Sequence, residues 1–506
     1  MRSPPVGDVP AEPIHTEPEP QARVVANSAW MLLAQAVAAL VAGGVSIYAI
    51  RTFTTSSWGH YSTALALVAL FSVFSGAGLA PLALREMTSA PRDQDEILGK
   101  TFDALIWTSG MALAALFVAT AALGYPRDVL VLVFLLAPSV LLDPLLANIG
   151  AAFNARSRLE YVALFQIVQS VVYGALAVVV IAAAGGVNGL AAATVTASLF
   201  AAVLALVLLR ERLHLRLRLR QRARNVWTFV RSAVPIAGIN FVAIVYARVD
   251  IVMLSVLSTS SKVAFYTVPY GLVRLSWLLP SVISAAFFPL LSRRLQTDRA
   301  DAQYLFFLVV RVFLLLSVPI SILLALSAPT LLPFVFGDSY SHSTAVLQIM
   351  AWTSVLGFQN YILWYGVLAS RGERAVFLIQ IAGLIVNVGI NAVAIPLYGP
   401  SGAATALVVS DLVVIGGMAV LVQRRLFPIP LVALLTKPAA TALAVVPAAA
   451  LLASRSPVGG AVTGAVAYVA ILLVLRYVTV EEWRPLIVIV KAPFGLLRRG
   501  KPGATR

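Results

Sequence analysis

Apolar residues form long runs along most of the chain, and short polar or basic segments separate them. A run of about 20 apolar residues can cross the hydrocarbon core of a bilayer as a helix. Such runs predict membrane-spanning helices near residues 27–49, 61–84, 103–124, 129–152, 161–183, 187–209, 231–256, 263–291, 304–327, 343–369, 375–396, 400–423, 431–453 and 457–478. We therefore expect an all-α polytopic membrane protein with about 14 transmembrane helices, joined by short connections.

Two distant stretches of this pattern match each other. Residues 158–212 align without a gap with residues 371–425, and a shorter echo pairs Tyr61-Ser62 with Tyr266-Thr267. The alignment superimposes Arg158 on Arg371, Glu160 on Glu373, Gly186 on Gly399, Gly189 on Gly402 and Arg212 on Arg425. A duplicated helical bundle is the plan of many secondary transporters, whose substrate lies between the two halves.

Composition supports the membrane assignment. Of 506 residues, 60% are hydrophobic and 11% are charged, whereas soluble proteins average about 25% charged residues. The net charge of +16 does not predict a nucleic-acid partner, because the arginines lie in loops between the predicted helices, where they set orientation. The chain has no cysteine, which excludes disulfides and cysteine-based metal sites.

The loop charges predict the orientation. If the N-terminus is cytoplasmic, the outer loops hold only Arg51, Arg127, Lys262 and Arg455, and every other loop cation lies inside. Cytoplasmic loops carry an excess of Lys and Arg. We therefore expect a multi-pass protein of the cytoplasmic (inner) membrane with both termini in the cytoplasm.

The same pattern divides the chain into segments. We predict a disordered cytoplasmic tail at 1–24, a first lobe at 25–212, a basic cytoplasmic linker at 213–230, a second lobe at 231–425, two further helices at 426–480 and a basic cytoplasmic tail at 481–506. Leu and Arg alternate over 213–220, which suits either an interfacial segment with its leucines in lipid or a plain orientation signal. The stretch 481–499 is too short in its apolar core to span, so we place it on the inner surface.

Four charged residues lie well inside predicted spans: Arg248, Asp250, Arg274 and Asp411. Each costs about 2.5–3.5 kcal/mol at mid-bilayer and therefore needs a reason. Arg248 and Asp250 are two positions apart and leave the helix in different directions. Asp250 and Arg274 lie at similar depths. They could form a structural ion pair, or they could line a polar cavity in which Arg274 holds an anion.

Other polar residues inside spans are amides and one acid. Asn387 and Asn391 share one helix face, where they either join helices or supply oxygens to a cation. Asp143-Pro144 predicts a kink beside a buried acid.

Catalytic chemistry is not evident. Gly99-Lys100-Thr101 resembles the end of a phosphate loop, but Gln94 stands where the motif needs glycine. His60 and His342 are isolated, so we predict no metal site, no cofactor and no catalytic residue.

The chain resembles the polysaccharide flippase family of the multidrug/oligosaccharidyl-lipid/polysaccharide exporter superfamily over about residues 25–480. The order and spacing of several short motifs carry the resemblance. They are Trp58-Gly59-His60-Tyr61-Ser62, Gly78-Leu79, Arg85-Glu86, Arg248-Val249-Asp250-Ile251-Val252-Met253-Leu254, Phe265-Tyr266, Pro280, Phe288-Pro289, Phe336-Gly337-Asp338 and Gly399-Pro400-Ser401-Gly402-Ala403-Ala404.

The resemblance implies two pseudo-symmetric six-helix lobes in a V around a cationic cavity, plus two C-terminal helices. It implies a flippase that moves a polyprenyl-pyrophosphate-linked oligosaccharide, a surface polysaccharide precursor, from the cytoplasmic to the outer leaflet. Arginine binds phosphate bidentately, so Arg274, Arg248 and Arg85 are the candidate substrate-binding residues. Relatives that flip the peptidoglycan precursor resemble the chain at Arg274 but carry arginines in helix 1, where this chain has none before Arg51. That difference argues against the peptidoglycan substrate.

The same relatives hold sodium in the second lobe, and Asp250, Asn387, Asn391 and Asp411 form the similar polar cluster here. Asn391 replaces an acid of that site, which leaves coupling to Na⁺ or H⁺ an open hypothesis. The expected partners are the lipid-linked oligosaccharide, membrane lipids and the polysaccharide polymerase and export machinery, with the chain as a monomer.

Two alternatives remain. A cation-coupled multidrug antiporter of the same superfamily would need a coupling acid that helix 1 lacks. A membrane-embedded glycan transferase or ligase would need acids in the first outer loop, Arg51 to His60, which has no carboxylate. We therefore expect a transporter and no enzyme.

Overall fold

The computed structural model describes residues 21–76, 78–90, 93–213, 215, 223–370 and 372–478. Within these ranges all regular structure is helical, and thirteen helical stretches are long and apolar enough to cross a membrane. Residues 343–369 were predicted as a further span, and they form α13 (Thr344–Met350) followed by α14 (Thr353–Ala369). The hydroxyl of Ser321 donates a hydrogen bond of 2.8 Å to the Ala351 carbonyl. This carbonyl lies where the two helices meet. The all-α polytopic fold is confirmed.

The first lobe consists of eight helices that build six predicted spans. They are α1 (Gln21–Thr52), α2 (Thr55–Gly76), α3 (Leu79–Ser89), α4 (Gln94–Ala122), α5 (Arg127–Leu136), α6 (Ser139–Ala155), α7 (Leu159–Ala182) and α8 (Gly186–Leu213). The span predicted at 129–152 is interrupted at Pro138, which has no N–H for the helix ladder. Helix α6 continues through Pro144, the position where the sequence predicts a kink.

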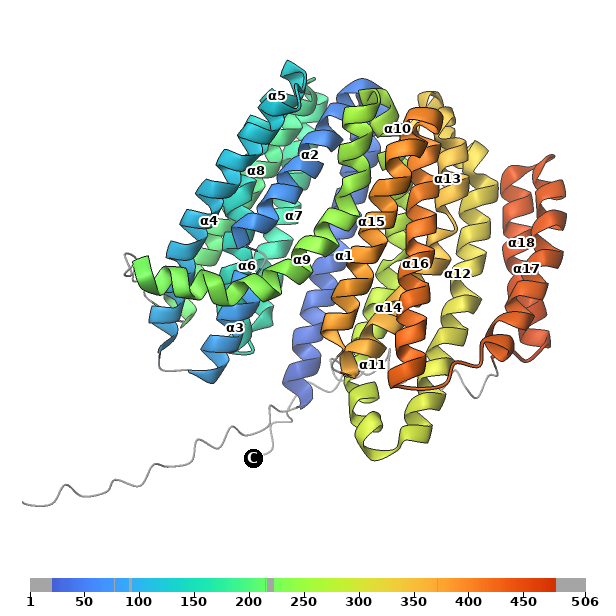
Figure 1. Ribbon diagram of the computed structural model, residues 1–506. Helices are drawn as coiled ribbons and strands as arrows, with labels where there is room; N and C mark the ends of the chain where they lie inside the picture. The colour runs from blue at the N-terminus through green and yellow to red at the C-terminus, as the bar shows by residue number, and fades with distance from the viewer. Residues whose placement is uncertain are drawn as a thin grey trace, which may run out of the picture.

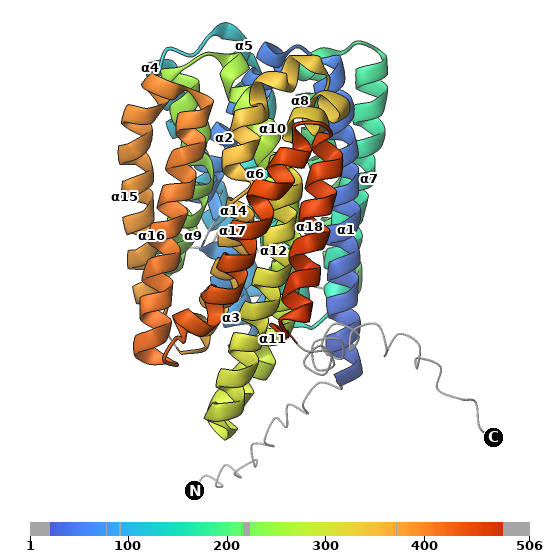
Figure 2. The ribbon, with the colours of Figure 1, turned by 90° about the vertical axis from the view of Figure 1, so that its right-hand side faces the viewer.

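The second lobe begins with a long helix and ends with the repeated pair. Its helices are α9 (Ala223–Leu257), α10 (Ser260–Ser276), α11 (Leu278–Thr297), α12 (Arg299–Phe336), the short 3₁₀ helix η2 (Asp338–Ser343), α13, α14, α15 (Glu373–Tyr398) and α16 (Pro400–Arg425). Figure 1 shows the two lobes as two inclined groups of helices. The last two helices, α17 (Leu431–Ala453) and α18 (Pro457–Val474), pack on each other and against α12 at the edge of the second lobe (Figure 2).

The sequence repeat has the same local structure in both copies. It forms the pairs α7–α8 and α15–α16, and the first glycine of each turn, Gly186 or Gly399, has a positive φ of 64° or 58°. Left-handed backbone of this kind favours glycine. A Cβ atom on the second glycine would lie 2.5 Å from Val180 Cγ1 at Gly189 and 2.1 Å from the Ala394 carbonyl oxygen at Gly402. Steric constraints therefore explain why glycine occupies both positions in each turn.

Helix α9 connects the lobes. It has 35 residues, which at about 1.5 Å per residue exceeds the roughly 30 Å of a bilayer core. Its first half lies across the first lobe near α3 and α4, and its second half rises beside α15 (Figure 1). At Gly78 an added Cβ would lie 2.4 Å from the Ala233 carbonyl oxygen, so the break between α2 and α3 receives this crossing helix.

Some predicted segments differ from the structure or lie beyond it. The final residues of the predicted linker, 223–230, are helical because α9 begins at Ala223. Leu213 and Leu215 are buried in the first lobe, so these two leucines of the alternating run do not face lipid. The rest of that run, the tail 1–20 and the stretch 481–499 lie outside the described residues. Helix α1 starts at Gln21, inside the tail predicted at 1–24.

The lobes meet where the first turns of α2 and α10 pack together, a contact that we call the seam. A Cβ on Gly59 would lie 1.8 Å from the Ser260 carbonyl oxygen, so the two backbones touch. Two hydroxyl pairs cross the seam, with Thr55 donating to Ser261 at 3.1 Å and Thr267 donating to Ser62 at 3.3 Å. The last pair joins the two copies of the Tyr-Ser/Thr echo seen in the sequence.

Further contacts reinforce the seam at the same end of the bundle. The hydroxyls of Tyr125 and Ser255 lie 2.8 Å apart, and Arg51 donates to the carbonyls of Val335, at 2.7 Å, and Phe334. Below them a single hydrophobic core draws buried side chains from both lobes.

Candidate functional site

A buried carboxylate lies at the centre of the second lobe. The side chain of Asp250, on α9, is 4% exposed. Tyr266 on α10 donates its hydroxyl to Asp250 Oδ2 at 2.6 Å, and Asn391 on α15 donates its amide to Asp250 Oδ1 at 2.6 Å. No ion pair joins Asp250 to Arg248 or Arg274 among the described residues. The structural ion pair that the sequence left open does not form in this structure.

The hydrogen bonds continue to a second carboxylate. Asn391 also donates to the Asn387 side-chain oxygen at 2.9 Å, and Asn387 donates to the Ser410 hydroxyl at 3.1 Å. Tyr246 lies within hydrogen-bond distance of both the Ser410 hydroxyl, at 3.1 Å, and Asp411 Oδ1, at 2.7 Å. We call this set the carboxylate network; it consists of Tyr246, Asp250, Tyr266, Asn387, Asn391, Ser410 and Asp411.

The network therefore brings together the four residues that the sequence proposed as a polar cluster. Asn387 and Asn391 are fully buried, and Asn391 Oδ1 has no hydrogen-bond partner in the described structure. Two carboxylates without a basic partner inside a membrane protein can hold protons or a cation. Sequence analysis did not assign Tyr246, Tyr266 or Ser410 to this cluster. The spacing in the sequence could have indicated two of these residues, because Tyr246 lies one helical turn before Asp250 on α9 and Ser410 directly precedes Asp411.

Two of the three candidate arginines lie near each other. The Arg274 guanidinium carbon is 5.8 Å from the centre of the Tyr270 ring, and the charges of Arg248 and Arg274 are close enough to repel each other. Arg274 is exposed and Arg248 is half-buried, and neither forms an ion pair in the part of the chain that is described. Arg85 is exposed on α3 in the other lobe, and no hydrogen bond or ion pair joins it to the first two.

A cavity of about 330 Å³ lies between α9, α10, α14, α15 and α16. Aromatic rings form much of its wall, and Asp411 connects it to the carboxylate network. Its aromatic and polar lining consists of Tyr246, Tyr270, Trp277, Asn360, Tyr361, Trp364, Tyr365, Gln380 and Asp411. The sequence analysis did not identify this cavity, although its α14 residues repeat with helical spacing.

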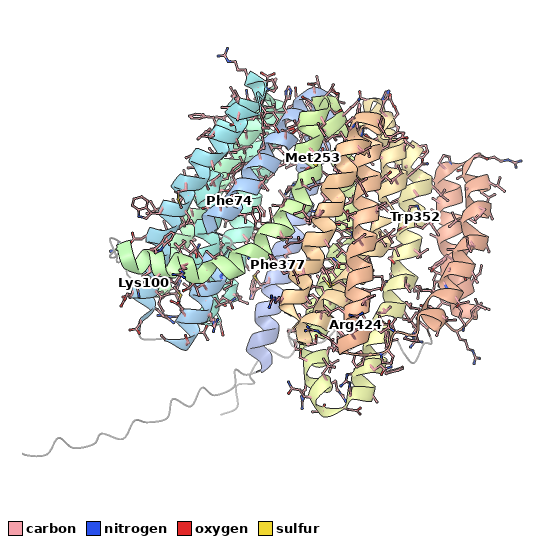
Figure 3. All side chains as sticks on the ribbon, in the orientation of Figure 1. Phe74, Lys100, Met253, Trp352, Phe377 and Arg424 are labelled. Carbon is pink, nitrogen blue, oxygen red and sulfur yellow. The ribbon has the colours of Figure 1, made fainter. Side chains whose placement is uncertain are left out.

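Basic residues gather away from the seam. Lys100 and Arg424 lie in the lower half of Figure 3, whereas Met253 lies in the upper half. Some of these cations also have structural roles. Arg156 donates to the Gln94 side-chain oxygen at 2.9 Å and to the carbonyl of Leu213 at 2.8 Å. Leu213 is the last residue of α8. Partial burial lowers the pKa of Arg156 from its ordinary value.

Comparison with known families now decides the class of the chain. A family described as "Polysaccharide biosynthesis protein" matches residues 24–295, which is more than half of the sequence. The chain belongs to this polysaccharide biosynthesis protein family. No curated protein sequence matches it.

Solved structures show the same fold at low identity. A lipid II flippase MurJ in an inward closed conformation superimposes with a TM-score of 0.71 at 12% identity, covering 90% of this chain and 99% of that one. An inward-facing multidrug resistance MATE family transporter of the MOP superfamily gives 0.59 at 13% identity, covering 80% and 94%. An outward-facing transporter of the same description gives 0.56 at 14% identity, covering 80% and 95%. This member of the polysaccharide biosynthesis protein family is therefore a multi-pass membrane protein with the fold of these transporters.

Proposed function

We propose that the chain is a flippase for a polyprenyl-pyrophosphate-linked oligosaccharide, which it moves from the cytoplasmic to the outer leaflet by alternating access. One observation carries the proposal: Arg248 on α9 and Arg274 on α10 lie near each other in the second lobe, and neither has a carboxylate partner among the described residues. Family membership supports a role in polysaccharide assembly.

The chemistry of such a substrate fits this arrangement. Its polyprenyl tail can stay in lipid while the polar head crosses through the protein. An unpaired arginine at mid-membrane costs about 2.5–3.5 kcal/mol, and a bound pyrophosphate would offset that cost with charge-assisted hydrogen bonds. Arg85, exposed on α3 among the basic ends of the first lobe, is proposed as an earlier contact for the same phosphates.

We place the basic end in the cytoplasm and the seam on the outer side, because cytoplasmic loops carry the excess of Lys and Arg. Both termini are then cytoplasmic, in the inner membrane. Asp338 is exposed near the seam end, at the start of η2. A cysteine at position 338 should react with a membrane-impermeant maleimide in intact cells, and reaction only after the cells are opened would reverse the orientation.

The test of substrate binding is Arg274→Ala. We expect it to abolish export of the cell-surface glycan while the protein still inserts, because the pyrophosphate loses its principal cation. Arg274→Lys should restore only part of the export, since lysine lacks the bidentate geometry. Surface glycan is measured by immunoblot against membrane levels of the tagged chain.

A matched control is Arg374→Ala. Arg374 is exposed on α15 and has no assigned role, so this variant should export normally. Normal glycan output from a well-expressed Arg274→Ala variant would contradict the proposal.

A second proposal concerns the driving force. The carboxylate network has two acids and no basic partner, which suits coupling to Na⁺ or H⁺ and also suits a cation-coupled antiporter. Asp250→Asn should remove ion-dependent transport in reconstituted vesicles while leaving the protein folded. Wild-type transport that ignores both ion gradients would exclude coupling. Extrusion of organic cations without any effect on surface glycan would favour the antiporter.

A further inference from the structure

The cavity of the second lobe has an unusual wall. Helix α14 contributes Gly357, Asn360, Tyr361, Trp364 and Tyr365, which follow the i, i+3, i+4, i+7, i+8 spacing of a single helix face. In a bundle such a face would ordinarily pack against its neighbours. Here it borders an open volume of about 330 Å³, which indicates a surface built for a ligand.

One aromatic ring of this wall is held in place by its neighbours. The Trp277 indole lies against Gly357, where a Cβ would come within 2.3 Å of Nε1. The same Nε1 donates to the Thr353 carbonyl at 3.3 Å, and the ring meets Tyr270 edge to face with centroids 6.2 Å apart. Trp277 is also the residue at which the predicted single span 263–291 divides into α10 and α11. The break therefore places the ring in the cavity.

One polar atom of the cavity lining is buried without a partner. Asn360 Oδ1 is buried and accepts no hydrogen bond in the described structure. An unsatisfied amide in an apolar setting costs about 1–3 kcal/mol, so a ligand hydroxyl that donates to it would recover that energy. Gln380 on α15 contributes a second amide to the lining.

The surrounding charges indicate which ligand fits. Aromatic rings beside a carboxylate such as Asp411 would suit an organic cation. However, Arg274 lies over the ring of Tyr270, a residue that lines the cavity, and also acts electrostatically on Tyr361, and Arg248 is nearby. Asp411 and Asp250, its neighbour in the carboxylate network, already accept hydrogen bonds from neutral donors, whereas neither guanidinium group forms an ion pair among the described residues. This difference favours a ligand that is anionic beside the arginines and neutral inside.

We propose that this cavity binds the sugar adjoining the pyrophosphate of the lipid-linked substrate. The rings of Tyr361, Trp364 and Trp277 contact the apolar face of the sugar, Asn360 and Gln380 bind its hydroxyls, and Arg274 and Arg248 hold the pyrophosphate at the rim. The inference rests on the proposed flippase function. At about 330 Å³ the cavity is at the small end of ligand sites, roughly 300–1,000 Å³, and suits the first sugars rather than a whole oligosaccharide.

The experiment separates the sugar from its carrier. The variants are Asn360→Leu, Tyr361→Ala, Arg274→Ala and, as a control outside the cavity, Trp352→Phe. Surface glycan is measured in cells, where the native substrate is present. Binding of a sugar-free polyprenyl pyrophosphate is measured by fluorescence titration of each purified full-length variant in nanodiscs. Tyr361→Phe and Asn360→Ala are milder changes at the same positions. They keep the test informative if Tyr361→Ala or Asn360→Leu fails to insert into the membrane.

We expect Asn360→Leu and Tyr361→Ala to lower export by about tenfold or more, equivalent to about 1.4 kcal/mol, while they bind the sugar-free carrier within about twofold of the wild type. Tyr361→Phe keeps the ring and should retain most export, and Trp352→Phe should behave as wild type. Arg274→Ala should lose both activities.

Three results would overturn the inference. In the first, both cavity variants export as much glycan as the wild type. In the second, those variants lose carrier binding together with export. In the third, the wild-type protein binds ethidium and Asp411→Asn removes that binding. The proposed function fails differently. In that case the wild type would bind no sugar-free carrier, or cells without the chain would export their glycan normally.

Discussion

At the scale of single residues, the second lobe uses neutral donors where an ion pair was one expectation. Asp250 accepts hydrogen bonds from a tyrosine hydroxyl and an asparagine amide, and Arg248 and Arg274 form no ion pair in the part of the chain that the structure describes. This separation keeps the acids in a network of hydrogen bonds and leaves the cations available to an anionic ligand. The division suits a protein in which the two kinds of charge have different roles.

The tyrosines of the second lobe offer a matched test of that network. Tyr266→Phe removes a donor to a buried carboxylate and should lower the free energy of unfolding by about 1.5–3 kcal/mol. Tyr340 is equally buried, but its hydroxyl has no partner in the described structure, so Tyr340→Phe should be neutral or slightly stabilising. Melting temperatures of the purified variants in detergent provide the comparison. Equal losses in the two variants would show that the Tyr266 hydroxyl contributes nothing.

The sequence revealed the charged and amide residues of the site because any polar group in an apolar run stands out. Asp250, Asn387, Asn391 and Asp411 were all recognised in this way. Their partners Tyr246 and Tyr266 were not assigned to the site, since tyrosine is common in membrane helices and its partner depends on tertiary packing. The cavity was missed for the same reason, because aromatic residues at helical spacing usually indicate core.

At the scale of elements, the repeat is the feature that sequence and structure share most fully. The first glycines of the two turns, Gly186 and Gly399, have similar positive φ angles because both turns need backbone that favours glycine. Helix breaks were less predictable. Gly78, Pro138, Trp277 and Ala351 each interrupt a run that hydrophobicity alone reads as continuous. Three of these breaks have a local cause, because Pro138, Pro81 and Pro280 have no N–H to donate to the carbonyl four residues earlier. The break at Ala351 depends on its contact with Ser321.

The second glycine of the repeat gives an element-scale prediction. At Gly402 an added Cβ meets the Ala394 carbonyl oxygen, which is backbone and cannot rotate away, so Gly402→Ala should destabilise the α15–α16 pair by about 1–3 kcal/mol. Gly416 lies on the same helix with open space around it. Gly416→Ala should be neutral or stabilising by about 0.4–1 kcal/mol.

Gly189→Ala in the first copy should cost less than Gly402→Ala, because its neighbour is the Val180 side chain. Thermal unfolding of the three variants in detergent checks the order. A Gly402→Ala variant as stable as the wild type would show that the helices separate without cost.

At the scale of the whole molecule, the lobes are closed at the seam, and the proposed alternating access requires that end to open. The all-helical fold and the positions of most spans could be predicted, because hydrophobic length is a property of the sequence; thirteen stretches are long and apolar enough to span in the described residues, against 14 predicted. Which end is closed could not be predicted. That depends on the relative packing of two lobes, and each lobe is compatible with more than one arrangement.

Because the chain has no cysteine, the seam can be locked with one engineered pair. The Ser62 and Thr267 hydroxyl oxygens are 3.3 Å apart, so cysteines at both positions need a small movement to form a disulfide of about 2 Å. Oxidised Ser62→Cys/Thr267→Cys protein should lose transport, and reduction should restore it. Flipping of a fluorescent lipid-linked substrate in vesicles is the measurement.

The control pair lies within one lobe. Ser75 and Ser109 have hydroxyl oxygens 2.5 Å apart on α2 and α4, so a disulfide there should leave transport intact. Transport by an oxidised seam variant that is fully cross-linked would mean that the seam does not open during the cycle.

The seam is held by hydroxyl pairs, a glycine contact and an arginine bound to backbone carbonyls, and no ion pair crosses it among the described residues. Electrostatic attraction between exposed ions weakens as salt rises, and it disappears when a carboxylate is protonated. Neutral hydroxyl bonds respond little to either change. In the proposed orientation, a gate of this composition would keep its opening equilibrium steady when the salinity or acidity of the medium outside the cell varies.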